Sequence, residues 1–206
     1  MTGLVIWAGA LALYLGFRLW YDGWRPPLTA TEIEGFIPRL PQSALANAAE
    51  VATLREFLAR DDGREFAMLN LVRIAPQPVA HPETGELTPA MDLLSVYTRE
   101  FVRALARKGG HPAIAARVIG GYLDSWNVGE DPGWTIVGYM RYRSRRDMLE
   151  LVTDPRFANA HAFKIAATAV TMSFPTAPRI LLFVSPRVWV GLVLALVAAL
   201  LHLTVG

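Results

Sequence analysis

Two long uncharged hydrophobic runs, one at each end, constrain the fold of this chain more than any other feature. The first, "TGLVIWAGALALYLGF", covers residues 2–17, and the second, "VWVGLVLALVAALLHLTV", covers residues 188–205. The second run alone would form about 27 Å of helix, close to the roughly 30 Å hydrocarbon core of a bilayer. We therefore predict transmembrane helices at residues 1–21 and 186–206, with the lipid bilayer as one partner.

The basic residues beside these runs predict the orientation of the chain. Arg18 and Arg25 follow the first run, Arg179 and Arg187 precede the second, and neither terminus carries a basic side chain. Because positively charged flanks favour the cytoplasmic side, we expect an inner-membrane protein with a cytoplasmic central domain and both termini outside. No basic residue precedes the first run, unlike in a secretory signal peptide, so we interpret it as a retained anchor.

The first predicted membrane helix has one face of small residues. Ala8, Ala12 and Gly16 recur every four residues, a spacing that lets another helix pack closely. We interpret this face as a docking surface for other membrane-protein subunits. Chance spacing in an Ala-rich helix is the alternative.

Between the two runs, the hydrophobic pattern predicts a collar followed by an α+β domain. Residues 22–46 are Pro-rich and predict a short helix capped by Thr29 or Thr31. Residues 47–179 predict one amphipathic helix and then strand, helix, strand, strand, helix and strand, which is the ferredoxin-like βαββαβ order. The predicted strands are residues 64–74, 113–126, 133–143 and 170–174. The predicted helices between them are residues 92–110 and a second helix over residues 145–169 that Thr153-Asp154-Pro155 breaks into two pieces.

Three stretches of this domain carry a resemblance to a known family. They are "LREFLARDDGREFAMLNLV", "GGHP" and "RYRSRRDMLELVTDPRFANAHAFK". Over residues 47–175 the chain resembles an uncharacterised family of the dimeric α/β barrel superfamily, often labelled as similar to antibiotic-biosynthesis monooxygenases. The resemblance implies that two ferredoxin-like units pair their sheets, as a homodimer or with a related chain. Some superfamily members are cofactor-free oxygenases, isomerases or haem enzymes, but the added membrane helices set this chain apart.

No catalytic set can be assembled from the residue spacing. The chain has no cysteine, and no nucleophile, base and orienting group occur together, so the sequence favours a non-enzymatic role and indicates no particular cofactor. His161 is a candidate ligand, acid or base, because the pocket of the resembling superfamily often lies beside that helix; a structural histidine is the alternative. An enzymatic site would add Asn70, Tyr97 and Arg141, and Tyr122 and Trp126 are further candidates to line the cavity.

His202 is a weak candidate metal ligand in an otherwise apolar run. A neutral imidazole inside a membrane helix can bind a haem-type or chlorophyll-type metal. An interfacial histidine that meets headgroups or water is the alternative, which its position four residues before Gly206 favours. The sequence otherwise predicts no metal site.

Four arginines fall within six residues of the domain, namely Arg141, Arg143, Arg145 and Arg146. A nucleic-acid partner does not fit a chain with a net charge of only +2 and no basic stripe with stacking aromatics, so we predict none. Ser144 and Asp147 form a capping box that starts a helix at this block, where cations need carboxylate partners. We interpret the last three arginines as an exposed edge that is salt-bridged or docks a partner, with a substrate clamp as the alternative.

These features predict a non-catalytic accessory or assembly subunit of a larger membrane complex, of the electron-transfer or light-harvesting kind. The chain would dock through its membrane helices and its basic edge. The alternative is a membrane-anchored small-molecule enzyme or sensor of the cofactor-free monooxygenase or isomerase type. A closed, polar-lined cavity that contains His161 and at least one of Asn70, Tyr97 or Arg141 would favour this alternative.

Overall fold

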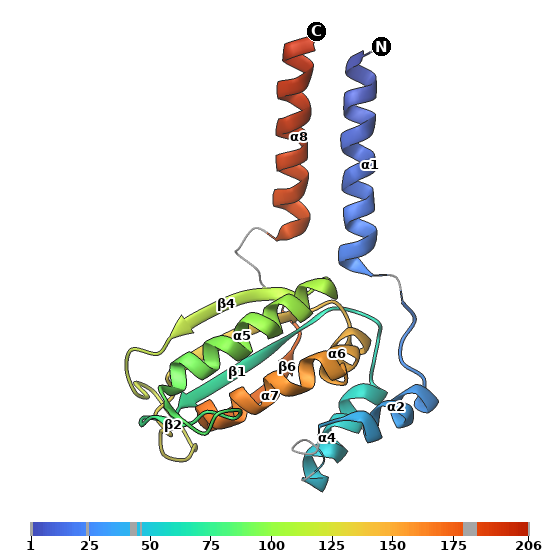
Figure 1. The fold of residues 1–206 in the computed structure, drawn as a ribbon. Coiled ribbons are helices and arrows are strands. Elements are labelled where there is room, and N and C mark those ends of the chain that lie inside the picture. Colours follow the sequence, from blue (N-terminus) through green and yellow to red (C-terminus); the bar gives the residue numbers. More distant parts are fainter. Residues whose placement is uncertain (1, 24, 42–44, 46, 179–184, 206) are drawn as a thin grey trace. The chain divides into compact units, whose positions relative to one another are not determined.

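The computed structural model describes residues 2–23, 25–41, 45, 47–178 and 185–205 (Figure 1). Arg179 and Gly206, on which two of the predictions draw, lie outside the described residues. The chain divides into two compact units, one of residues 1–24 with 178–206 and the other of residues 25–177.

The first unit is a pair of antiparallel helices, α1 (Thr2–Asp22) and α8 (Pro186–Val205). Both are long and apolar enough to cross a membrane, by length and composition. The helices approach closely at two glycines: Gly191 packs under the Tyr14 ring, and Gly3 lies against the imidazole of His202, where a Cβ would overlap the ring. The Tyr14 hydroxyl also donates a hydrogen bond to the Arg187 carbonyl oxygen at 2.9 Å.

An ionic cluster ties the two helices together at one end. The Asp22 carboxylate accepts hydrogen bonds from Arg18 Nε and from Arg187 Nε, both at 2.6 Å. By contrast, Ala8, Ala12 and Gly16 are exposed. The helix α8 therefore packs on a different face of α1 from the one that carries these small residues.

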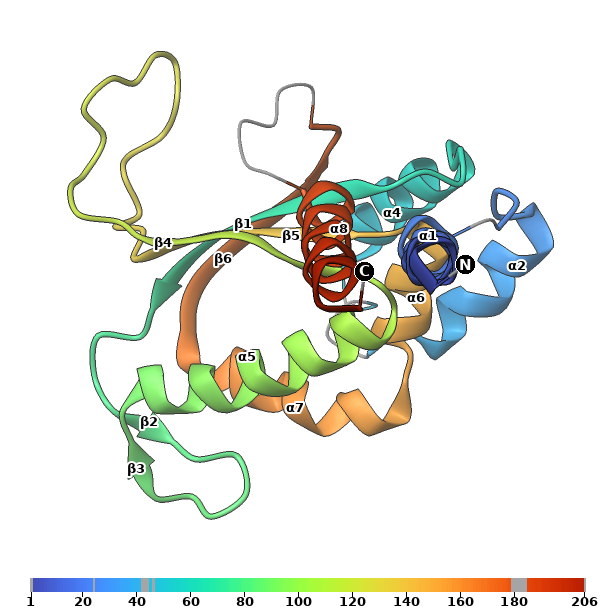
Figure 2. The ribbon, with the colours of Figure 1, turned by 90° about the horizontal axis from the view of Figure 1, so that it is seen from above.

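The second unit contains a four-stranded antiparallel sheet in the order β4-β5-β1-β6. Two long helices, α5 and α7, lie along one face of the sheet (Figure 2). With the chain order βαββαβ, this arrangement confirms the predicted ferredoxin-like topology. The elements are β1 (Phe66–Ile74), α5 (Ala90–Arg107), β4 (His111–Arg117), β5 (Ile136–Tyr142), α6 (Arg145–Val152), α7 (Pro155–Ala167) and β6 (Thr168–Thr176).

The prediction for the second strand is wrong in its extent. The strand β4 ends at Arg117, and an irregular segment occupies residues 118–135. The Asp131 carboxylate accepts hydrogen bonds from the backbone N–H groups of Tyr122 at 3.0 Å and Gly133 at 2.8 Å. Because a side chain accepts these hydrogen bonds, the backbone N–H groups do not need the carbonyl groups of a neighbouring strand. Between β1 and α5, where no strand or helix was predicted, the chain forms two short paired strands, β2 (Val79–Ala80) and β3 (Leu87–Thr88).

The Pro-rich collar is packed into the same unit as the sheet. It forms α2 (Ala30–Phe36) and a 3₁₀ turn, η1 (Ile37–Arg39), and it is followed by α4 (Ala48–Ala59). Of the two predicted capping residues, Thr29 caps α2 through a capping box with Glu32. Collar side chains share one buried core with the domain: Leu28, Ile33, Ile37 and Leu40 join Leu58, Phe101, Leu105, Leu149 and Leu151.

The two faces of the sheet differ in how far they are covered. Alternation along β1 directs Met68, Asn70 and Val72 toward the helices. On the opposite face the structure leaves large apolar side chains about two-fifths exposed, namely Ile114 at 40%, Met172 at 45% and Phe174 at 42%. An uncovered apolar sheet face is typical of a surface that another protein covers.

Candidate functional site: a cavity between the helices and the sheet

A cavity of about 860 Å³ lies between α5, α7 and the helix-facing side of the sheet. Its size falls within the range of small-molecule sites. Most of its lining is apolar and comes from Met68, Leu94, Phe101, Met140, Tyr142, Met148 and Phe157. The polar lining comes from Asn70, Ser95, Tyr97, Thr98, Arg99, Arg103, His161, Lys164 and Ser173.

Tyr97 on α5 stands at the centre of an aromatic cluster in this cavity. Its ring centroid lies 5.6 Å from those of both Phe101 and Phe157, and the His161 ring meets it edge-on at 6.3 Å. Burial raises the pKa of the Tyr97 hydroxyl well above its usual range, so this group stays protonated at neutral pH. The cluster thus offers flat apolar surface and one neutral hydroxyl.

Two basic side chains reach the cavity from one face of α7. His161 and Lys164 are three residues apart, a spacing that places both on the same side of a helix. Burial, together with the nearby charge of Lys164, lowers the pKa of His161. Burial also lowers the pKa of Lys164, whose Nζ lies 5.7 Å from the Tyr97 ring centroid. At neutral pH His161 is therefore an uncharged imidazole that can accept a proton.

Asn70 on β1 is held in one orientation by its neighbours in the sheet. Its Nδ2 donates to the carbonyl oxygens of Met68 at 3.0 Å and Gly138 at 3.4 Å, and the Ser173 hydroxyl donates to its Oδ1 at 2.8 Å. Strand register places Gly138 and Ser173 on either side of Asn70. The cavity floor therefore carries a rigid polar pair within an apolar surface.

The structure brings together three of the four residues predicted for an enzymatic site. His161, Asn70 and Tyr97 all line the cavity, whereas Arg141 does not. Alternation along β5 puts Arg141 on the other face of the sheet, where its Nε and Nη2 bind the Glu65 carboxylate at 2.8 Å and 2.6 Å.

Two further candidates lie outside the cavity, and six of its polar lining residues were not predicted, namely Ser95, Thr98, Arg99, Arg103, Lys164 and Ser173. Tyr122 and Trp126 are exposed on the segment 118–135, where they do not line the cavity. Lys164 and Ser173 do line it. The i,i+3 spacing of Lys164 from His161 was a usable signal, but Ser173 depends on strand register across a long sequence separation.

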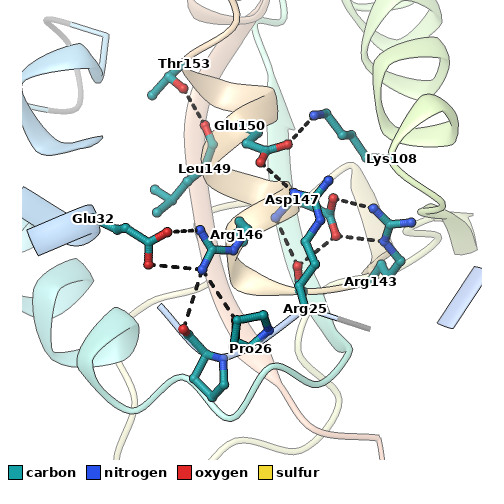
Figure 3. Close-up of polar contacts among 12 residues, drawn as sticks. Arg25, Pro26, Glu32, Lys108, Arg143, Arg146, Asp147, Leu149, Glu150 and Thr153 are labelled. Atoms are coloured by element: carbon teal, nitrogen blue, oxygen red, sulfur yellow. Dashed lines mark hydrogen bonds and ion pairs between the residues drawn. The ribbon is translucent and has the colours of Figure 1, made fainter. Parts of the chain in front are cut away.

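The arginine block forms a second polar cluster, centred on α6 (Figure 3). Arg143 binds both carboxylate oxygens of Asp147, through Nε at 2.8 Å and Nη2 at 2.7 Å. Ser144 caps the helix as predicted, since its Oγ accepts from Asp147 N at 3.1 Å and donates to the Asp147 carboxylate at 2.7 Å. Asp147 is only 1% exposed, so this is a buried ion pair.

The other arginines of the block reach the collar and α4. Arg146 pairs with Glu32 and donates to the carbonyl oxygens of Pro26 at 3.4 Å and Pro27 at 3.5 Å. The bond from Arg146, followed by those from Thr29, lowers the pKa of Glu32 to about 2. The Arg145 guanidinium lies 4.5 Å from the centroid of the Phe57 ring and 3.6 Å from an Asp61 oxygen.

The prediction that these arginines form an exposed edge is therefore at odds with the structure. The side chains of Arg143, Arg145 and Arg146 are only 11%, 15% and 13% exposed. Carboxylates of the same chain supply the partners that the helix start requires. The block joins the collar and α4 to the α/β domain.

No metal centre is evident in the described residues. They contain no group of three or more His, Asp or Glu side chains placed to hold a metal ion. His202 packs against Gly3 of the neighbouring helix.

Comparisons with known proteins bear on the fold. No family model and no curated protein match the chain. A protein of unknown function from Rhodopseudomonas palustris is similar in structure, with a TM-score of 0.53 and 23% identity, over 66% of this chain and 95% of that chain. This similarity concerns the fold alone.

Two weaker structural similarities are also found. SnoaB, a cofactor-independent oxygenase from Streptomyces nogalater, has a TM-score of 0.37 and 12% identity, over 58% of this chain and 97% of that chain. A dimeric protein of unknown function and ferredoxin-like fold from Bacteroides fragilis has a TM-score of 0.32 and 14% identity, over 56% and 96%. Neither bears on the activity of this chain.

Proposed function

We propose that residues 25–177 bind an apolar small molecule in the cavity between α5, α7 and the sheet. They would form the ligand-binding domain of a membrane-anchored enzyme or sensor. The observation that carries this proposal is the convergence of His161, Tyr97 and Asn70 on one cavity of about 860 Å³. A largely apolar pocket with a few convergent polar groups is the usual form of a small-molecule site.

The three side chains suit acid and base chemistry on a bound molecule. An imidazole with a lowered pKa is uncharged at neutral pH and can take a proton from a substrate. The Tyr97 hydroxyl keeps its proton and can donate a hydrogen bond to a carbonyl oxygen. In a sensor, the same groups would orient the ligand without turnover.

Filling the cavity tests the proposal. In nanodiscs of zwitterionic lipid, the full chain should bind the neutral aromatic probe naphthamide, as measured by isothermal titration calorimetry. A Ser173→Phe substitution places a ring where the probe would lie and should weaken binding by at least about tenfold. Met172→Phe, on the opposite face of the same strand, should change the affinity less than about twofold. A wild-type chain that binds neither naphthamide nor its anionic counterpart naphthoate would contradict the proposal.

A second candidate function is that of an accessory or assembly subunit of a larger membrane complex, of the electron-transfer or light-harvesting kind. Two uncovered surfaces support it: the small-residue face of α1 and the apolar face of the sheet. In this proposal α1 and α8 span the inner membrane, residues 25–177 are cytoplasmic, and the sheet pairs with a second copy or a related domain, as in a dimeric α/β barrel.

Charges on the sheet face should separate paired domains. Met172→Glu combined with Phe174→Glu would bring carboxylates into an apolar interface, so the chain should shift from a larger assembly to a single copy. Native mass spectrometry from membranes would report the change, with Ala106→Glu on the exposed side of α5 as the control.

Ala8→Leu with Ala12→Leu should in turn weaken association with other membrane helices. A wild-type chain that already runs as a single copy would rule out this candidate.

A further inference from the structure

All charged side chains that line the cavity are basic. Among the residues that the structure describes, they are Arg99, Arg103 and Lys164, and none of these residues places a carboxylate in the lining. The charge of Arg103 is offset by Glu100, whose carboxylate accepts a hydrogen bond from Arg103 Nη1 at 2.7 Å. Arg99 is exposed, so it meets solvent. Lys164, which is partly buried, is the cation that lies deepest among apolar groups.

Lys164 has no ion-pair partner among the residues that the structure describes, and its environment is aromatic. Its Nζ lies over the Tyr97 ring at 5.7 Å. The arginines of the block at residues 141–146 differ, because each faces a carboxylate of the same chain, as Arg143 faces Asp147 and Arg146 faces Glu32. A desolvated cation without an anion is costly, and burial accordingly lowers the pKa of Lys164.

We infer that the cavity takes an apolar molecule that carries one carboxylate, with the carboxylate paired to Lys164 and the hydrocarbon body packed against Tyr97, Phe101 and Phe157. This inference rests on the proposed function and specifies the chemical class of its ligand. A carboxylate would supply the anion that Lys164 lacks, and it would meet no negative side chain in the lining. A basic ligand would be repelled, and a neutral one would leave the lysine unpaired.

A matched pair of probes separates the charge from the apolar body. Naphthoate and naphthamide have the same ring system, but only naphthoate is an anion at neutral pH. With the full chain in zwitterionic nanodiscs, we expect naphthoate to bind at least about tenfold more tightly than naphthamide. Lys164→Met should abolish this preference and leave the affinity for naphthamide within about twofold, which also shows that the cavity is intact.

Two further variants control for charge and fold. Arg107→Met removes one positive charge from the exposed end of α5, outside the cavity, and should keep the preference. Lys164→Arg keeps the charge at the site and should keep the preference as well. If Lys164→Met is the only one of these variants that loses the preference for naphthoate, the result supports pairing of the carboxylate with Lys164.

The outcomes distinguish this inference from the proposed function. If the wild-type chain binds the two probes equally well, the cavity accepts apolar molecules and the carboxylate inference is wrong. If the preference for naphthoate persists in Lys164→Met, the anion pairs elsewhere and the inference is again wrong. If the wild-type chain binds neither probe, the proposed function fails together with the inference.

Discussion

Replacing Asp147 with Asn should lower the free energy of unfolding by about 3–5 kcal/mol. The Asp147 side chain is 1% exposed, and it binds the Arg143 guanidinium at 2.8 Å and 2.7 Å. The substitution would leave that guanidinium buried without a counter-charge. Denaturant unfolding followed by near-ultraviolet circular dichroism would measure the loss.

The expected loss comes from the uncompensated charge, which a double variant can test. Arg143→Met combined with Asp147→Leu removes both charges and should recover much of the free energy of unfolding that Asp147→Asn loses. Apolar residues of similar size often stabilise a protein as much as the buried ion pair that they replace. Asp92→Asn, at an exposed position in the first turn of α5, should cost less than about 1 kcal/mol. An Asp147→Asn variant as stable as the Asp92→Asn control would contradict the prediction.

The same ion pair should make the domain sensitive to acid. Burial raises the pKa of Asp147, but the hydrogen bonds from Arg143 and Ser144 lower it by more than burial raises it. The net pKa of Asp147 therefore lies below the ordinary value of 3.8. A carboxyl whose pKa is lowered in the folded state contributes stability that is fully present at a pH above its pKa in the unfolded state. This contribution is lost as the pH falls through its pKa in the folded state. The wild-type chain should therefore lose stability below about pH 3.8, and Asp147→Asn should lack this component of the loss.

Replacing Gly110 with Ala should cost about 3 kcal/mol of folding stability, at the upper end for an overpacked site. A Cβ at this position would lie 2.6 Å from the backbone oxygen of Arg141 and 2.5 Å from Leu105 Cδ1. The backbone oxygen belongs to β5, which pairs with the start of β4, so it cannot move without disturbing the sheet.

Gly120→Ala is the matched control for this substitution, because a Cβ there would meet no atom within 4 Å. It should change the free energy of unfolding by less than about 0.5 kcal/mol. Thermal and denaturant unfolding of both variants would test the difference. Equal stabilities of the Gly110→Ala and Gly120→Ala variants would contradict the prediction, because they would show that the protein accommodates a Cβ at Gly110.

Local features of the fold could be predicted from the sequence by itself. The capping residues Thr29, Asn47 and Ser144 start helices because each places a side-chain oxygen beside free backbone N–H groups, an interaction within three residues. The order of strands and helices follows from hydrophobic period, and it is enough to indicate the ferredoxin-like topology. His161, Asn70 and Tyr97 were named as cavity candidates because the resemblance to the dimeric α/β barrel superfamily implies a pocket between helix and sheet, and all three line the cavity.

Tertiary structure alone decided which partners these residues meet. The arginine block was predicted to be an exposed edge, but two of the carboxylates that pair with it, Glu32 and Asp61, come from the collar and from the turn after α4. Ser173 reaches Asn70 only through the register of β6 on β1. A linear pattern reports the propensity of each segment, whereas ion pairs, strand register and an unpaired lysine such as Lys164 depend on contacts between segments that are distant in the chain.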